Sequence, residues 1–443
     1  MKFSLFISII FILSIFSFYC QNLKSRKLLE ENVISTITSD DELTLTQATK
    51  QLWKTGGYIY IDTPVITISQ KDVDIGGNLE GGIIGVQQPN GEYPILDCKL
   101  LRKKDSGYFG LSIAGNNLKV QNIIIENAPS YGIFVAGNHN VIDHVITRYN
   151  GESGIYVNSQ GDFNTFNYCY SYRNFLMPNM NMNKDGDGFT IEINSYNNEF
   201  NYCFAWDNSK SGFSYYSIPF SQAKNTYEHF TYSHCASWNN GNIDVFSGKY
   251  DFDNGRQLDK KLITIQEILE SDKNFENNYN IKKFNLENAK INNTLATELF
   301  ANYEEKTRGI GGSGFILGSS RSHKILGNQR EADYCVSFDH KLKGFNNNDS
   351  QNFTSLFTNC VGFNNNINYE LPYVFTKWSN NWGWGSKEKD LFDLNLDLHV
   401  KTPNDIKSAQ KNFYSVRDKI IRAVEDNTFP DINFDKAIKS LSE

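Results

Sequence analysis

The sequence lacks several features that would point to common protein classes. It has no excess of basic residues, since its formal net charge is −7 at pH 7, so it offers no electrostatic basis for binding nucleic acid or acidic membranes. It contains no CxxC or HxxxH spacing, so a zinc site is not expected. It also lacks the regular leucine spacing of leucine-rich repeats.

Long apolar runs are missing after residue 20. Before that point, one lysine is followed by an apolar run from Phe3 to Phe18, which is typical of a secretory signal peptide. No later stretch is long and apolar enough to span a bilayer. We therefore expect a secreted, extracellular protein with no membrane contact after signal removal. Glycosylation sequons at Asn292, Asn348 and Asn352 are consistent with a glycoprotein.

What the sequence does contain is a repeat. The pattern Gly-apolar-any-apolar recurs at intervals of roughly 22 residues or more. Its copies begin at Gly110, Gly132, Gly154, Gly188, Gly212 and Gly314, with a weaker one at Gly344. Each unit holds short alternating apolar runs and little helical signal, which predicts an all-β fold, the right-handed parallel β-helix. We expect each of these glycines to open a tight corner in left-handed backbone.

Two other residue types recur at fixed places in the repeat. Six cysteines follow the expected signal peptide, and four share one repeat position: Cys169, Cys203, Cys235 and Cys360. A ladder of buried thiols fits this spacing better than disulfides, which remain the alternative. An asparagine precedes successive strands, at Asn117, Asn140, Asn164, Asn198 and Asn225. This predicts amide hydrogen bonds from coil to coil.

The repeat divides the chain into segments. These are a signal peptide (1–20), a loose leader (21–43), a β-helix domain (44–369) with an inserted excursion (241–308), and a C-terminal Trp-rich and helical extension (370–443). A capping box at Thr44 and Gln47 predicts a short helix over Thr46–Lys54 that covers the N-terminal end of the core. A second helix is predicted by apolar positions at Ile406, Ala409, Phe413, Val416 and Ile420. It would pack on the side of the solenoid or close its C-terminal end.

Candidate site residues gather around one copy of the repeat. Asp187 is the only acid that directly precedes a repeat glycine, and Asp185 lies two residues earlier. Both could hold Ca²⁺, although this ion takes about 6–8 oxygen ligands, and the structural alternative is an Asx turn. Lys210 could act as the base in β-elimination of a uronate polymer, or it could simply be a solvated lysine. Lys210 and Arg308 could both bind sugar carboxylates.

The strings DGDGFTIE, NYCFAWDNSKSGFSYY, GGSGFILGS and TNCVGFNNNINY resemble polysaccharide lyase family 9, over roughly Gly110–Tyr369 apart from the insertion. That family comprises pectate lyases with a right-handed parallel β-helix. The resemblance implies cleavage of an acidic polysaccharide such as pectate (polygalacturonate), with Ca²⁺ as cofactor. Asp187 matches one of the family's Ca²⁺ ligands.

The sequence departs from the family's pattern at its other site positions. The family has a motif like NSDDGWD where this chain has NSKSGFS, so Lys210, Ser211 and Ser214 replace acids. Ile316 stands where the family has its catalytic lysine. Two hypotheses follow, both for a monomer. In one, the protein is a lyase in which Lys210 acts as the base or replaces the metal cation. In the other, it is a lapsed enzyme that binds carbohydrate or serves as a scaffold.

Overall fold

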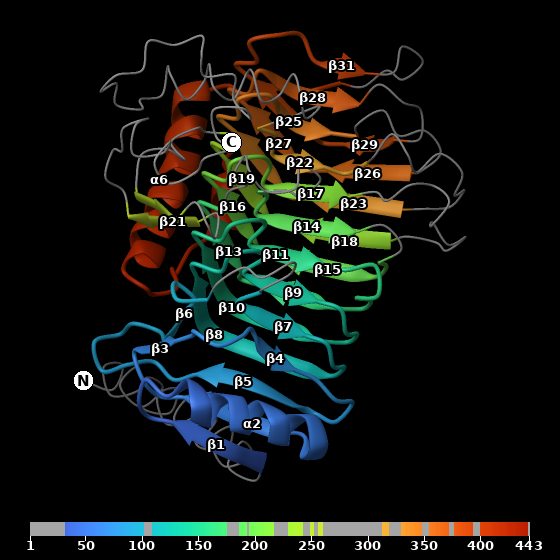
Figure 1. Ribbon diagram of the computed structural model, residues 1–443. Helices are drawn as coiled ribbons and strands as arrows, with labels where there is room; N and C mark the ends of the chain where they lie inside the picture. Colours follow the sequence, from blue (N-terminus) through green and yellow to red (C-terminus); the bar gives the residue numbers. More distant parts are fainter. Residues whose placement is uncertain are drawn as a thin grey trace, which may run out of the picture.

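The structure is a computed structural model in which coils of parallel strands stack along one axis (Figure 1). It describes residues 32–101, 109–174, 186–192, 195–216, 229–241, 249–251, 256–259, 312–318, 329–347, 354–371, 376–392 and 399–441. The expected signal peptide, the sequons Asn292, Asn348 and Asn352, and most of the expected excursion lie outside these ranges. The expected right-handed parallel β-helix is confirmed.

Two long sheets form the walls of the described solenoid. The first (sheet A) consists of β1 (Val33–Ile37), β2 (Gly57–Ile61), β3 (Val65–Thr67), β5 (Gly81–Gly85), β6 (Ile95–Asp97), β8 (Leu118–Glu126), β10 (Val141–Arg148), β12 (Thr165–Asn167), β13 (Tyr170–Tyr172), β15 (Asn198–Asn201), β16 (Phe204–Trp206), β18 (His229–Ser233), β19 (Ala236–Trp238), β23 (Gln329–Asp333), β24 (Val336–Phe338), β26 (Thr354–Thr358), β27 (Val361–Phe363), β29 (Thr376–Ser379) and β30 (Trp382–Trp384).

The second (sheet B) consists of β4 (Val73–Ile75), β7 (Leu111–Ile113), β9 (Ile133–Val135), β11 (Ile155–Val157), β14 (Phe189–Glu192), β17 (Phe213–Tyr216), β22 (Phe315–Ile316), β25 (Lys343–Asn346), β28 (Ile367–Leu371) and β31 (Leu391–Phe392). A short antiparallel pair, β20 (Lys249–Asp251) and β21 (Arg256–Asp259), lies in the expected excursion. Three helices complete the described elements: α2 (Glu42–Thr55), α6 (Ile406–Glu425) and α7 (Phe434–Lys439).

The solenoid extends beyond the expected limits at both ends. Strand β1 lies inside the segment expected to be a loose leader, and it pairs in parallel with β2. Helix α2 begins at Glu42 rather than Thr46, because the side chain of Asp41 accepts the N–H of Thr44 at 2.9 Å. At the other end, β30 continues sheet A and β31 continues sheet B past residue 369. The tryptophans of β30 therefore belong to a further coil.

The repeat glycines are not left-handed, which corrects the expectation for the corners. Within the described chain, none of the repeat glycines has a positive φ, whereas Tyr168 and Tyr202 do, at 50° and 51°. The glycines are needed for close packing instead. A Cβ on Gly188 would lie 2.6 Å from the carbonyl oxygen of Gly212 and 2.7 Å from the Cβ of Ala205. Real Cβ atoms do not tolerate such contacts, so only glycine lets successive coils approach there.

The expected thiol ladder is confirmed. The six described cysteines are all free and buried. The Sγ of Cys203 donates to the carbonyl oxygen of Phe166 at 3.5 Å, and that of Cys235 donates to the carbonyl oxygen of Phe200 at 3.3 Å. These two thiols therefore bond to the coil before them, and burial raises the pKa of the Cys203 and Cys235 thiols well above the usual value.

The expected asparagine ladder is also confirmed in its described part. Asn140 Oδ1 accepts the N–H of Leu118 at 2.8 Å, Asn164 Oδ1 accepts that of Asn140 at 2.9 Å, and Asn198 Oδ1 accepts that of Asn164 at 3.0 Å. Asn117 is outside the ladder, since it occupies a left-handed corner with φ of 60°. Asn225 lies outside the described residues.

Helix α6 packs along the flank of the solenoid, as the apolar pattern indicates (Figure 1). It buries Ala409, Phe413, Ile420 and Val424, whereas Ile406 is exposed and Val416 is half-buried. The helix packs against aromatic rings on the outer side of sheet A, from strands β13, β16, β19, β24 and β27. Among them are Tyr172, Trp206, Trp238, Phe338 and Phe363. Burial of these large apolar faces holds the helix in place.

Candidate functional site

The corner that leads into sheet B aligns the candidate residues coil by coil. The N–H of Gly154 donates to the carbonyl oxygen of Asp187 at 3.0 Å, and the N–H of Gly188 donates to that of Ser211 at 2.9 Å. Ser153, Asp187 and Ser211 therefore occupy one column on successive coils. Within the described residues Asp187 is the acid of that column, as the sequence predicts.

Asp187 is fully buried and its carboxylate serves the backbone of the next coil. Its Oδ1 accepts the N–H of Ser211 at 2.8 Å, and its Oδ2 accepts the hydroxyl of Thr190 at 3.2 Å. The hydroxyls of Ser153 and Thr190 are 2.9 Å apart. Hydrogen bonds of this kind satisfy a buried carboxylate. The Asp187 carboxylate therefore accepts a backbone N–H, as the structural alternative expects, but from the next coil rather than within an Asx turn.

Lys210 lies one coil after Asp187, in a neighbouring column. Its N–H donates to the carbonyl oxygen of Gly186 at 3.0 Å, and the N–H of Glu152 donates to that of Ser130 at 3.1 Å. The bond between Gly154 and Asp187 fixes the alignment of these two coils, and it makes Glu152 a neighbour of Gly186. Glu152 and Gly186 therefore lie in the same column as Lys210. The lysine side chain is half-buried.

Glu152 is a candidate residue that sequence reasoning missed. Its side chain is fully buried, and its Oε2 accepts the hydroxyl of Ser130 at 2.6 Å. The available signal was its place two residues before the repeat glycine Gly154, which is the place of Lys210 before Gly212. The corner thus combines two buried carboxylates, Glu152 and Asp187, with the ammonium-bearing side chain of Lys210.

Two further positions at which this chain departs from the family's pattern, Ser214 and Ile316, lie on the outer face of sheet B. Thr190 is aligned with Ser214, and Phe213 with Phe315, so Ser214 and Ile316 are neighbours. Ser214 is buried and Ile316 is half-buried. The residues expected to replace acids and the catalytic lysine therefore do come together beside Asp187. A hydroxyl and an aliphatic side chain supply neither a strong metal ligand nor a proton acceptor there.

The described part of this corner fits Ca²⁺ poorly. Among the residues that the structure describes, no group of three or more His, Cys, Asp or Glu side chains could hold a metal ion. Ca²⁺ takes about 6–8 oxygens, several of them from carboxylates. Asp185 and Arg308 both lie outside the described residues. Calcium binding and a role for Arg308 stay predictions.

Glu192 ends strand β14 at the far side of the same sheet. Its Oε2 accepts the amide of Asn158 at 2.8 Å and the N–H of Ser159 at 3.0 Å. Burial raises the pKa of Glu192 above its usual value, while hydrogen bonds from the Ser159 N–H and the Tyr156 hydroxyl oppose the rise. The carboxylate therefore braces a turn of the preceding coil.

Aromatic rings continue this face on the N-terminal side of Asp187. Tyr131 stacks on Tyr156 with centroids 4.3 Å apart, and Phe109 stacks on Phe134 at 4.4 Å. Tyr156 is aligned with Thr190, which bonds to Asp187. Apolar ring surface beside a few polar groups is the usual lining of small-molecule sites.

The comparisons with known proteins agree with this architecture. The family model described as "Pel9A-like, right handed beta helix region" matches residues 30–259, more than half of the chain. The chain therefore belongs to the Pel9A-like right-handed β-helix family, which confirms the resemblance seen in its motifs. None of the curated proteins matches the sequence. No helix among the described residues is long and apolar enough to cross a membrane.

Two solved structures are similar in fold. One is the pectate lyase Pel9A, with 17% identity and a TM-score of 0.52, where the match covers 84% of this chain and 80% of that one. The other is described as a rhamnogalacturonan lyase, with 17% identity and a TM-score of 0.56, covering 91% of this chain and 96% of that one. At this identity the likeness shows the fold alone.

Proposed function

We propose that this protein is a secreted, lyase-like β-helix protein that engages acidic polysaccharide on the outer face of sheet B. Family membership supports the polymer class, because both similar structures are described as lyases, one of pectate and one of rhamnogalacturonan. The observation that carries the proposal is the alignment of Lys210 with the Asp187 and Glu152 corner. Lys210 places a positively charged side chain at that corner, on a face that otherwise presents hydroxyl groups.

The proposed chemistry is β-elimination on a uronate residue. A base removes the proton α to the sugar carboxylate, and the electron pair of that C–H bond becomes the carbon–carbon double bond; the bond to the β oxygen breaks, and this oxygen leaves with the bonding pair and takes up a proton. The developing negative charge needs a cation close to the carboxylate. In this chain the proposed base, or the cation in place of a metal, is Lys210.

A second candidate function is binding without cleavage. It is favoured by the contacts of Asp187, whose two carboxylate oxygens accept bonds from Ser211 and Thr190. It is also favoured by Ile316, which cannot accept a proton at the family's base position. In this alternative the aromatic and hydroxyl side chains of sheet B hold the polymer and the chemistry has lapsed.

The test is absorbance at about 235 nm after mixing protein with polygalacturonate, since β-elimination creates a conjugated double bond. It is run with Ca²⁺ and with chelator, on the wild type and on Lys210→Ala. The matched control is Lys119→Ala, a half-buried lysine on sheet A. Lyase activity through Lys210 predicts a rise that survives chelation and disappears in Lys210→Ala only. No rise, with polymer retained by the protein, assigns the binding function.

A further inference from the structure

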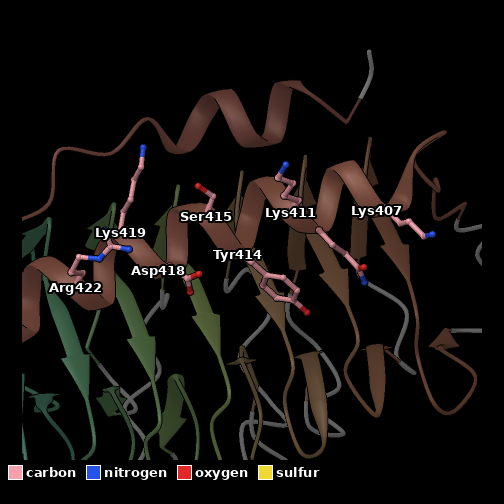
Figure 2. Close-up of a pocket in the computed structure, with 8 residues that line it drawn as sticks. Lys407, Lys411, Tyr414, Ser415, Asp418, Lys419 and Arg422 are labelled. Atoms are coloured by element: carbon pink, nitrogen blue, oxygen red, sulfur yellow. The ribbon is translucent and has the colours of Figure 1, made fainter.

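The outer face of α6 carries a row of basic side chains. Opposite the buried residues of this helix, Lys407, Lys411, Lys419 and Arg422 are all exposed. Figure 2 shows them along the length of the helix, and they line a shallow groove of about 560 Å³ together with Gln410, Tyr414, Ser415 and Asp418. We call this set the α6 groove. Basic residues gather here although the whole chain carries a net charge of −7.

The positive charge of the α6 groove is not cancelled from within. Its one acid, Asp418, accepts the Nε–H of Arg417 at 2.9 Å and an NH2 donor of the same guanidinium at 2.8 Å. Arg417 lies outside the groove lining, so it neutralises Asp418 from beside it. For the four groove cations no ion pair is found with the described part of the chain. They are therefore available to an external polyanion.

The groove also has a fixed aromatic wall. The hydroxyl of Tyr414 donates to Asp339 Oδ1 at 3.1 Å and accepts the amide of Asn364 at 3.0 Å. The guanidinium of Arg417 covers its ring at 4.4 Å. A ring held from two sides loses little freedom when a ligand arrives, so contact with it costs little entropy.

The groove follows the long axis of the solenoid. Gln410 near its start bonds to Asn364 at 3.2 Å, and the carbonyl of Val424 near its end accepts Arg148 at 3.2 Å. These partners belong to a late and an early coil, so the helix spans many coils. Lys411 and Lys419 are two turns apart, about 12 Å. Charges spread along one side of a helix suit a linear polymer with one carboxylate per sugar.

We infer that the α6 groove is a second binding surface for acidic polysaccharide, separate from the outer face of sheet B. A linear polyanion would be held there by Lys407, Lys411, Lys419 and Arg422 and guided by the fixed ring of Tyr414. The identity of the polymer as a uronate rests on the proposed function. The groove itself does no chemistry, and it raises the local concentration of polymer at the protein.

The test measures binding rather than turnover. Dissociation constants for polygalacturonate are determined by calorimetry at low salt, without Ca²⁺, for the wild type and for Lys411→Gln with Lys419→Gln. The control is Lys50→Gln with Lys54→Gln, which removes the same charge from two exposed lysines of α2. We expect about fivefold weaker binding for the α6 variant, from two exposed ionic contacts. Added salt should weaken wild-type binding and reduce this difference.

Several outcomes would overturn the inference. Equal weakening in the α2 control would mean that only net charge matters, and no wild-type binding would remove the surface altogether. Binding to vesicles of anionic lipid through the same two lysines, with none to polygalacturonate, would assign a membrane surface instead. The absorbance test of lyase activity is independent of these results. A protein that binds through α6 and forms no product keeps the groove and loses only the lyase proposal.

Discussion

His340 occupies a place that asparagines fill elsewhere in the solenoid. A second asparagine ladder runs through Asn150, Asn174, Asn208, Asn240 and Asn365. Between the last two stands His340, whose Nδ1 lies 3.2 Å from the N–H of Asn240 and whose Nε2 lies 3.1 Å from the carbonyl oxygen of Ser237. The ring thus copies an asparagine side chain, with Nδ1 as the acceptor and Nε2–H as the donor.

This histidine makes stability depend on pH. Burial lowers the pKa of His340 to about 3 from its usual 6.5. Between these values the unfolded chain binds a proton that the folded chain does not, so stability falls as the pH drops below about 6.5. In that window the free energy of unfolding of the wild type should fall by roughly 1.4 kcal/mol for each pH unit because of His340. We expect His340→Asn to remove this contribution. Urea unfolding from pH 7 to pH 4 measures it, with the exposed His139→Asn as control. Parallel pH curves for wild type and His340→Asn would contradict it.

The acids missing from the site can be restored. Lys210→Asp, Ser211→Asp and Ser214→Asp together recreate the family's acidic motif beside Asp187. Two of these positions are buried, with Ser211 at 0% and Ser214 at 2% exposure, so the new charges are costly unless a cation neutralises them. We expect Ca²⁺ to raise the Tm of the triple variant and to leave the Tm of the wild type unchanged. At 100 times the Kd, bound Ca²⁺ would add up to about 2.7 kcal/mol to the free energy of unfolding of the variant. A wild-type shift would show that the natural corner holds calcium.

Not every residue of this corner was accessible to sequence reasoning. The position of Asp187 followed from the spacing of the repeat glycines, because spacing fixes which residues share a column. The roles of Glu152 and His340 did not, since both residues stand at repeated positions but act through hydrogen bonds that only the fold creates. The sequence also did not reveal why position 188 must be glycine. Its small size serves a close contact with the next coil, which no local turn rule describes.

At the scale of elements, one arginine ties the C-terminal helix to the solenoid. The Nε of Arg148 donates to Glu126 at 2.6 Å, and its terminal nitrogens donate to the Tyr172 hydroxyl at 3.1 Å, the Val424 carbonyl at 3.2 Å and Asn427 Oδ1 at 2.8 Å. Arg148 is buried. The network therefore closes the end of α6 with charge-assisted bonds.

Breaking this network should cost more than breaking an exposed ion pair. Arg148→Met keeps the apolar stem and leaves Glu126 without its buried partner, so we expect a loss of about 3–5 kcal/mol. The comparison is Arg417→Met, which removes partly exposed pairs with Asp418 at 2.8 Å and Asp339 at 3.9 Å and should cost about 1 kcal/mol or less. Urea midpoints followed by tryptophan fluorescence distinguish the two. Similar midpoints for both variants would mean that α6 is held by its apolar face alone.

The placement of α6 illustrates how far periodicity reaches. Apolar spacing predicted a helix and its buried face, and Ala409, Phe413 and Ile420 are buried. The partner of that face could not be read from the sequence, because the rings of Tyr172, Trp206 and Phe363 lie in separate repeats. They form a surface only when the coils stack. The described end of the expected leader differs from the prediction for a related reason, since β1 is stabilised by pairing with β2.

At the scale of the whole molecule, the cysteine ladder joins successive coils in the later part of the solenoid. Cys169, Cys203, Cys235, Cys335 and Cys360 lie on successive coils, and each Sγ bonds to the coil before it. Helix α6 lies along the same coils, with contacts from Arg148 to Asn364. Simple solenoids unfold repeat by repeat because each unit touches only its neighbours. A helix that spans many coils adds contacts that this nearest-neighbour picture omits.

The thiols can report whether the solenoid unfolds as one unit. They are fully buried, so a thiol reagent should not modify them in the native protein, and thiols react only as exposed thiolates. We expect all of them to become reactive over a single urea transition that coincides with the loss of the far-ultraviolet circular dichroism signal. In Arg148→Met, which releases the end of α6, the transition should broaden or split, with thiols near one end reacting first. Stepwise thiol exposure in the wild type would mean that stacking between neighbouring coils, rather than the α6 strap, sets the cooperativity. Mass spectrometry of the labelled peptides identifies which coils open first.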